Sequence, residues 1–220
     1  MASKRYGPEA LVGAIRAGEI NLLGGGIDAP ESNQEVRARQ GQDWLVPGWL
    51  PAGTVTMFQS ADERDARTLS LQLAMCFAAG QPFLGHKLPR GPNSALVLST
   101  VAQPWQVKQS FAEIERGLRL KSKALKRMLF CPADGSDRVL ARPAKAPWHL
   151  EPTAVYAELL ELVEERQPGL IVLDSLPDLF GGDHFDHRHT TGFMALMERL
   201  CSVANATMLL LAPADFGAYR

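Results

Sequence analysis

The sequence predicts an α/β fold in which helices cover both faces of a parallel sheet of about five strands. Two observations support this. Five short apolar runs alternate with segments of helical length between residue 43 and the end of the chain, an order typical of parallel α/β domains. The last two runs lack any alternation of polar and apolar residues, as expected of strands covered on both faces. Right-handed crossovers should join the strands.

The individual elements follow from apolar patterning and from residues that start or stop helices. The expected strands are Thr54–Phe58, Ala95–Ser99, Arg127–Cys131, Leu170–Asp174 and Thr207–Ala212. The expected helices are Asp65–Ala79, Gln103–Leu118, Pro152–Arg166 and Arg188–Ala204. The first helix carries one apolar stripe made of Leu69, Leu73, Cys76 and Phe77. Gly80 should end that helix, and Pro152 suits the first position of the third.

Residues 1–42 are expected to form an N-terminal arm or linker, and residues 43–220 the folded domain. A short helix is expected over Pro8–Ala17 within the arm. Three consecutive glycines and a polar stretch over Asp28–Gln42 follow it. This composition is typical of a linker.

Composition narrows the class of protein. The 220 residues carry a formal net charge of −1, which excludes a global attraction to nucleic acid or anionic lipid and leaves local basic patches open. The three cysteines lie far apart in apolar runs, so free buried thiols in a reducing cytoplasm are expected. No apolar stretch reaches the roughly 20 residues of a membrane span, and no signal core is present. A cytoplasmic protein without a membrane partner is therefore expected.

Three segments, in order, resemble one known group of proteins. Trp44–Val55 resembles the approach to the first strand, written VPG-hydrophobic-PxGxV. Leu69–Gly85 resembles the helix after a phosphate-binding loop and the turn beyond it. Leu170–Asp183 resembles the Walker B strand and its loop. Together they are similar to the hexameric RecA-like P-loop ATPases of the plasmid replicative helicase (RepA) type, related to DnaB, RadA and KaiC. The resemblance covers about residues 43–216 and implies a RecA-like fold.

The resemblance places the phosphate-binding motif GxxxxGK[S/T] on residues 60–67, which read SADERDAR. Glycines in this motif let several backbone N–H groups converge on phosphate, the Lys neutralises the β- and γ-oxygens, and the hydroxyl holds Mg²⁺. Here Ser60 and Asp65 stand for the two glycines, Ala66 for the Lys and Arg67 for the Ser/Thr. All four defining positions differ, so the Walker A motif is degenerate and ATP is not expected as a cofactor.

The charges of this segment support the same expectation and leave two alternatives open. Asp62, Glu63 and Asp65 fall where a triphosphate would lie. A like-charge pair about 4 Å apart costs on the order of 1 kcal/mol in water and more when partly buried. One alternative is that Arg64 and Arg67 bind another anion at the helix N-terminus. The other is a retained nucleotide site in which Thr68 takes the metal-binding role.

The residues that would hydrolyse ATP are also missing. The resemblance expects a Glu after the second strand, and that position falls on Val101, or on Thr100 if the register is off by one. Neither side chain can act as a general base. Only Asp174 and the adjacent Ser175 persist from the chemistry of the family, and Asp174 could equally hold a loop or cap a helix. No catalytic residue is predicted.

Three histidines and two aspartates lie within the seven residues from Asp183 to His189. His184, His187 and His189 are candidate metal ligands by residue type, although their spacing is not that of a zinc site. A solvated loop and a partner-facing or DNA-facing loop are the alternatives. In RecA-like rings this loop faces the central channel, which makes His187, Arg188 and His189 the candidate contacts to nucleic acid.

Trp44 and Trp49 are candidate anchors for a protein partner or a second copy of the chain, because aromatic residues are enriched at such anchors. The alternative is that both rings cover their own core. The leading hypothesis is a catalytically inactive scaffold or regulator that acts through protein partners, in a complex for DNA replication, DNA repair or mobile-element transfer. The rivals are a motor subunit with an atypical ATP site and an ATP-independent module that binds single strands.

Overall fold

The computed structural model describes residues 43–216, apart from 90–92, 101–103, 121–125, 133–137 and 146–148. The expected arm, residues 1–42, and its helix over Pro8–Ala17 lie outside the described residues. No described helix is long and apolar enough to cross a membrane.

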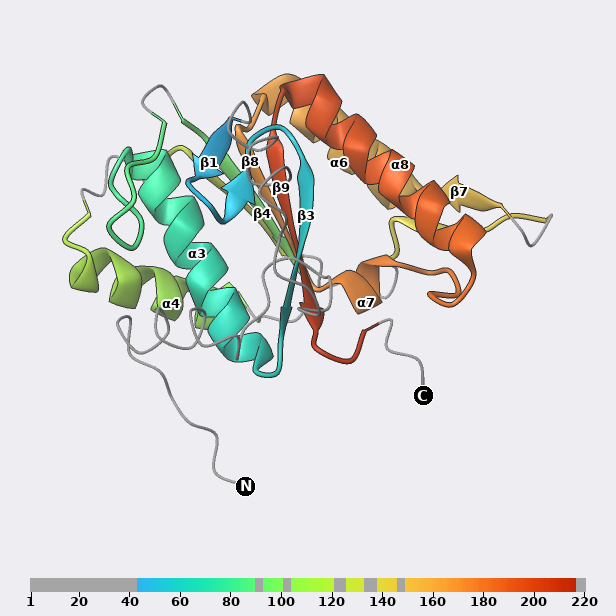
Figure 1. Ribbon diagram of the computed structural model, residues 1–220, viewed down its shortest axis with the longest axis horizontal. Helices are drawn as coiled ribbons and strands as arrows, with labels where there is room; N and C mark the ends of the chain where they lie inside the picture. The colour runs from blue at the N-terminus through green and yellow to red at the C-terminus, as the bar shows by residue number, and fades with distance from the viewer. Residues whose placement is uncertain are drawn as a thin grey trace, which may run out of the picture.

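A five-stranded parallel sheet forms the centre of the domain (Figure 1). Its strands are β3 (Val55–Ser60), β4 (Ala95–Ser99), β5 (Met128–Pro132), β8 (Leu170–Asp174) and β9 (Thr207–Pro213). Their order across the sheet is β3-β9-β8-β4-β5, and every neighbouring pair is parallel. The predicted fold class is therefore confirmed, with strand ends that differ from the predicted ones by two residues at most.

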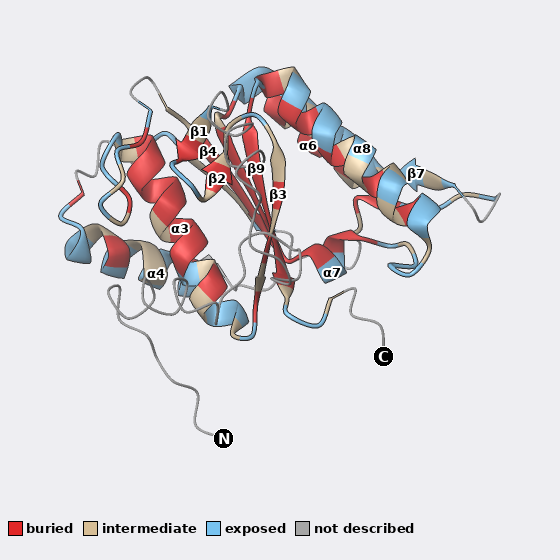
Figure 2. Ribbon diagram, viewed as in Figure 1, coloured by how far each residue is buried: buried red, intermediate tan, exposed pale blue. Residues whose placement is uncertain are grey.

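Helices cover both faces of this sheet (Figure 1). Helices α3 (Glu63–Ala79) and α4 (Pro104–Gly117) lie on one face, and α6 (Ala154–Arg166) and α8 (His187–Ala204) lie on the other. Two separate cores result, because alternate residues of a strand point to opposite faces. In β8, Leu170 and Val172 belong to the α3 core, whereas Ile171 and Leu173 belong to the α6–α8 core. Figure 2 shows the buried strands between the two helical layers.

The burial of each strand explains whether its sequence is apolar throughout or alternates between apolar and polar residues. The inner strands β4 and β8 are buried at every position, and their sequences are apolar almost throughout. The edge strand β3 alternates between buried and half-buried positions. The other edge strand, β5, has no fully buried residue.

The structure adds elements that the sequence analysis did not predict. Strands β1 (Trp44–Val46) and β2 (Leu50–Pro51) form a small antiparallel pair, as do β6 (Ala141–Pro143) and β7 (Leu150–Pro152). A single helical turn, α7 (Leu176–Leu179), follows β8. Pro152 ends β7 and does not begin α6, so that prediction was wrong: Thr153 is the N-cap, and its hydroxyl accepts the N–H of Tyr156.

Candidate functional site

The site to examine is the edge of the sheet where the parallel strands end, because ligands of open α/β sheets bind outside these carboxyl ends. Ser60 ends β3, Ser99 ends β4 and Asp174 ends β8. The N-terminus of α3 lies at the same edge, since α3 follows β3 directly (Figure 1). The start of α3, Asp174 and the end of β4 therefore lie at one edge of the sheet.

The connection between β3 and α3 is a tight turn rather than a long phosphate-binding loop. Only Ala61 and Asp62 separate Ser60 from Glu63, the first residue of α3. The Asp62 carboxylate accepts the backbone N–H groups of Arg64 at 2.9 Å and of Asp65 at 3.3 Å. These are the N-terminal amides that would be offered to a phosphate. The chain's own carboxylate thus occupies the anion position at the start of α3.

The two positions that should be glycine and lysine are also built into the helix and the core. Asp65 lies in the first turn of α3, where burial, and then the charge of Asp62, raise its pKa. Ala66 is 3% exposed and belongs to the core beneath α3. The Cβ of any side chain at position 66 would therefore lie in the buried core and not in an open loop.

Arg67 and Asp174 form an ion pair between α3 and the end of β8. The Arg67 Nε lies 2.6 Å from Asp174 Oδ2, and Nη2 lies 3.4 Å from Oδ1. The hydroxyl of Ser99 donates to the same Oδ2 at 2.8 Å. Asp174 is 2% exposed, so its charge needs a partner inside the protein. A guanidinium therefore neutralises the aspartate of the strand that resembles Walker B, a residue that holds Mg²⁺ in P-loop NTPases.

Thr100 connects β4 to the segment after β8. Its backbone N–H donates to the Asp174 carbonyl at 2.6 Å, and its hydroxyl donates to Asp178 Oδ2 at 2.7 Å. The same hydroxyl accepts the N–H of Ser175 at 3.1 Å, across the cis peptide bond that joins Asp174 and Ser175. Thr100 thus holds the loop in place; it is one of the two positions onto which the resemblance places the family's Glu. Val101, the other candidate position for the base, lies outside the described residues.

A family model described as AAA domain matches residues 29–212 of the chain. The chain belongs to this AAA domain family. The predicted kinship with P-loop, RecA-like ATPases is therefore confirmed. No curated protein matches the chain. The matched range of this AAA domain begins within the segment predicted to be an arm.

In this AAA domain the hydroxyl of Thr68 bonds to its own helix. It donates to the Arg64 carbonyl at 2.8 Å, one turn earlier in α3, and Thr68 is exposed. The contacts of Asp174 described above come from Arg67 and Ser99 instead. The displaced metal-binding role considered for Thr68 finds no support in these bonds.

The candidate residues of the histidine loop have different surroundings. His189 is 6% exposed, and its Nδ1 accepts the N–H of Asp183 at 3.0 Å. His187 Nδ1 lies 2.7 Å from the Thr191 hydroxyl, and the His184 ring lies beside that of Phe185, tilted by 44° with centroids 4.0 Å apart. Among the described residues, no three His, Cys, Asp or Glu side chains come together as a metal site would require.

Arg188, the remaining nucleic-acid candidate, is exposed and pairs with the N-cap residue of α8. Its Nη2 lies 2.8 Å from Asp186 Oδ2. The side-chain hydrogen bond from Arg188, followed by its backbone N–H, lowers the pKa of Asp186 to about 2. A phosphate would therefore have to compete with a carboxylate for this guanidinium.

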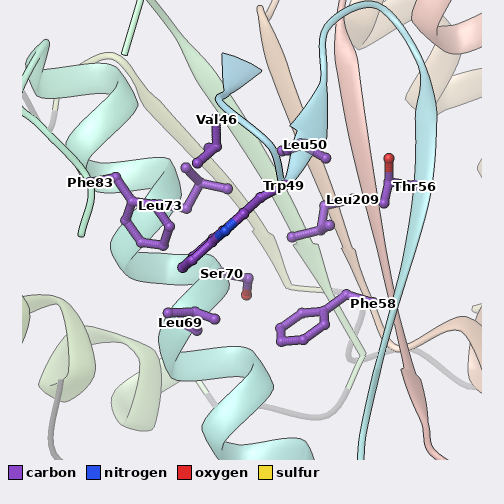
Figure 3. Close-up of a pocket in the computed structure, with 10 residues that line it drawn as sticks. All are labelled: Val46, Trp49, Leu50, Thr56, Phe58, Leu69, Ser70, Leu73, Phe83 and Leu209. Atoms are coloured by element: carbon purple, nitrogen blue, oxygen red, sulfur yellow. The ribbon is translucent and has the colours of Figure 1, made fainter. Parts of the chain in front are cut away.

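Of the two tryptophans, Trp49 packs on its own domain (Figure 3). Its indole meets the Phe83 ring edge-on at 6.4 Å between centroids and lies 5.4 Å from the His86 ring. It also lines an apolar cavity of about 30 Å³ between the β1–β2 pair, α3 and the sheet. Trp44 is half-buried in β1. For Trp49 the structure favours the alternative in which the ring covers its own core.

Sequence reasoning missed two features of this site. The Arg67–Asp174 pair joins residues 107 positions apart, and no local pattern signals such a contact. The role of Asp62 had a local signal, because Asp directly before a helix is a preferred N-cap. Its negative charge alone does not reveal this role.

Proposed function

We propose that this AAA domain is a pseudo-ATPase: a RecA-like scaffold or regulatory protein that acts through protein partners and does not hydrolyse ATP. The observation that carries the proposal is the Arg67–Asp174 ion pair. It puts a protein cation on the carboxylate that would otherwise serve Mg²⁺. We also propose that residues 43–220 form the domain and residues 1–42 an arm.

The free energy of the Arg67–Asp174 pair, compared with that of nucleotide binding, supports this proposal. Removing one partner of a fully buried ion pair costs on the order of 3–5 kcal/mol, and about 2–4 kcal/mol is expected here because Arg67 is 19% exposed. A dissociation constant of 1 µM corresponds to about −8.2 kcal/mol, and 1 mM to about −4.1 kcal/mol. A nucleotide that needed Asp174 for its Mg²⁺ would first have to open the pair with Arg67. A cost of about 2–4 kcal/mol would weaken the affinity by roughly 30- to 900-fold, less the part that contact of Mg²⁺ with Asp174 returns.

Two further features act in the same direction. Asp62 takes the N-terminal amides of α3, so a phosphate would have to displace a carboxylate held within the same chain. Ala66 supplies no charge where the motif has lysine. The motor-subunit hypothesis uses Arg64, Arg67 and Thr68 for nucleotide. Of these three side chains, those of Arg67 and Thr68 already have bonds within the protein.

Calorimetry with Mg-ATP tests the proposal. We expect no binding tighter than about 1 mM and no phosphate release above background. Micromolar affinity for Mg-ATP would contradict the proposal outright.

A variant that carries the four defining residues of the GxxxxGK[S/T] motif is compared with the wild type. The variant Ser60→Gly/Asp65→Gly/Ala66→Lys/Arg67→Ser removes the guanidinium and returns the four motif residues. We expect it to gain affinity for nucleotide but to be less stable than the wild type, because Asp174 loses Arg67 and a lysine replaces the buried Ala66. Circular dichroism checks that the variant is folded under the binding conditions. It should not turn ATP over, because no carboxylate stands at the position of the base. Arg166→Ser, on an exposed arginine of α6, is the control and should behave as the wild type.

A further inference from the structure

A cleft of about 680 Å³ lies between α3 and α4, beside the Arg67–Asp174 pair. This volume falls in the range of clefts that hold small organic ligands, about 300–1,000 Å³. The cleft is distinct from the apolar cavity under Trp49, which is far smaller and lies over a different part of α3. Neither the family match nor the Mg²⁺ position assigns it a role.

The chemistry of the cleft changes from one wall to the other. Arg64 and Arg67 line the α3 side, and the buried side chains of Leu71 and Val107 provide an apolar floor. The α4 side offers amide groups from Gln106 and Gln109. A ligand that matches these walls has an apolar body, hydrogen-bonding edges and an anionic group.

Trp105 supplies the feature that selects among such ligands. It lines the cleft from the first turn of α4 and is 63% exposed. Its indole combines a large apolar face with one N–H donor, and a nucleic-acid base stacks favourably on such a face. The ring offers a planar surface on which a heterocycle can stack, next to a cation.

Arg64 supplies a cation for an anionic group. It is exposed, and its guanidinium makes no ion pair or hydrogen bond within the part of the chain that the structure describes. Arg67, by contrast, is held by Asp174. Glu63 and Asp65 flank Arg64 along the chain, and the Glu113 carboxylate also lines the cleft, where it accepts a hydrogen bond from Gln109. These negative charges favour a ligand with one phosphate over a triphosphate.

We propose that the α3–α4 cleft binds a nucleoside monophosphate unit, either free or at the end of a single strand. The base stacks on the indole of Trp105, and the phosphate pairs with Arg64. Arg67 remains paired with Asp174. Binding of the monophosphate therefore does not require Mg²⁺ at Asp174. The inference goes beyond the pseudo-ATPase proposal and does not depend on it.

Nuclear magnetic resonance of the full chain tests this in buffer without Mg²⁺. The indole N–H signal of Trp105, assigned from its loss in Trp105→Phe, is followed while AMP or a 5′-phosphorylated tetrathymidylate is added. We expect this signal to shift with saturation. Equal affinities would identify a free nucleotide as the ligand, and an oligonucleotide affinity at least tenfold higher would identify a strand end.

Variants make the test specific to the cleft. Trp105→Ala and Arg64→Gln should each lower affinity by roughly tenfold, the effect of losing one stacked base or one charge contact; for these two, calorimetry replaces the indole signal. Phe185→Ala and Arg166→Gln remove an exposed ring and an exposed arginine elsewhere, and they should bind as the wild type does.

Two results would overturn the inference. One is no shift of the Trp105 signal with either probe at about 10 mM, roughly ten times a dissociation constant of 1 mM. This result would leave the pseudo-ATPase proposal intact. The other is binding that requires Mg²⁺ and is lost in Asp174→Asn, because the nucleotide would then occupy the P-loop position. That second outcome would also contradict the pseudo-ATPase proposal.

Discussion

At the scale of single residues, Asp174 is the group whose surroundings decide the chemistry of the site. It is 2% exposed, and a buried carboxylate without a partner is strongly unfavourable. A metal ion or a protein cation can neutralise it. Arg67 does so with two nitrogens, at 2.6 and 3.4 Å, and Ser99 adds a hydrogen bond at 2.8 Å. The carboxylate is fully satisfied without a metal.

Removing Arg67 should therefore cost stability. For Arg67→Ala we expect the free energy of unfolding to fall by about 2–4 kcal/mol, somewhat below the loss from a fully buried pair, because the Arg67 side chain is 19% exposed. Urea denaturation measures the change. Arg166→Ala, which removes an exposed pair with Glu165, should change stability by no more than about 1 kcal/mol.

A double substitution separates the pair from other contacts of Arg67. In Asp174→Asn the charge that needs Arg67 is gone. We therefore expect Arg67→Ala to be much less destabilising in that background than in the wild type. If Arg67→Ala costs no more than Arg166→Ala, the pair does not hold Asp174 in the way inferred here.

At the scale of elements, α3 and α8 begin in the same manner. Each has an aspartate N-cap, Asp62 or Asp186, whose carboxylate accepts an N–H of the first turn. Such a cap stabilises a helix by about 1 kcal/mol. In α3 this cap explains why the helix begins at Glu63, two residues before the predicted start.

The cap of α8 predicts a pH dependence. The pKa of Asp186 is lowered from 3.8 to about 2, first by the side-chain hydrogen bond from Arg188 and then by the Arg188 N–H. The unfolded chain therefore binds this proton more tightly. The stabilising contribution is present above about pH 4 and is lost as the pH falls through 2.

Carboxyl chemical shifts followed from pH 6 to 1.5 measure this. Asp186 should titrate near pH 2, and in Arg188→Ala its pKa should rise part of the way toward 3.8, because the backbone N–H remains. Asp65 serves as the internal reference, since burial and the charge of Asp62 raise its pKa. The inference fails if Asp186 titrates at or above Asp65.

At the scale of the whole molecule, the β1–β2 pair packs beside α3 on one face of the sheet, and its two tryptophans differ. Trp49 is packed against Phe83 and the adjoining core. Trp44 is half-buried and lies in β1. The proposed contact with a partner or a second copy therefore depends on Trp44, and substitution of Trp49 would report mainly on folding.

Light scattering tests this contact. If the chain self-associates through Trp44, the variant Trp44→Ala should be folded by circular dichroism and should have a smaller mass than the wild type. Truncation of a buried aromatic anchor typically costs about 2 kcal/mol or more of binding. A monomeric wild type, or a variant with unchanged mass, would remove self-association through this residue.

Much of the fold was predictable because it is encoded in local periodicity. The apolar runs over Leu170–Asp174 and Thr207–Ala212 identified inner strands, and the stripe containing Leu69 and Leu73 identified the core face of α3. Short strands without a clear apolar pattern were missed, and the β6–β7 pair is an example. The start of α6 was misplaced because Pro152 suits the end of an edge strand as well as the start of a helix.

By itself, the sequence determined the α/β class and the residues SADERDAR at positions 60–67, where the resemblance places GxxxxGK[S/T]. The tertiary structure alone decided which groups these residues contact. Arg67 and Asp174 meet because parallel strands end at one edge of the sheet and α3 crosses over β8. The α3–α4 cleft likewise exists only once both helices pack on the same face. Such contacts depend on strand order and helix packing, which residue spacing along the chain does not encode.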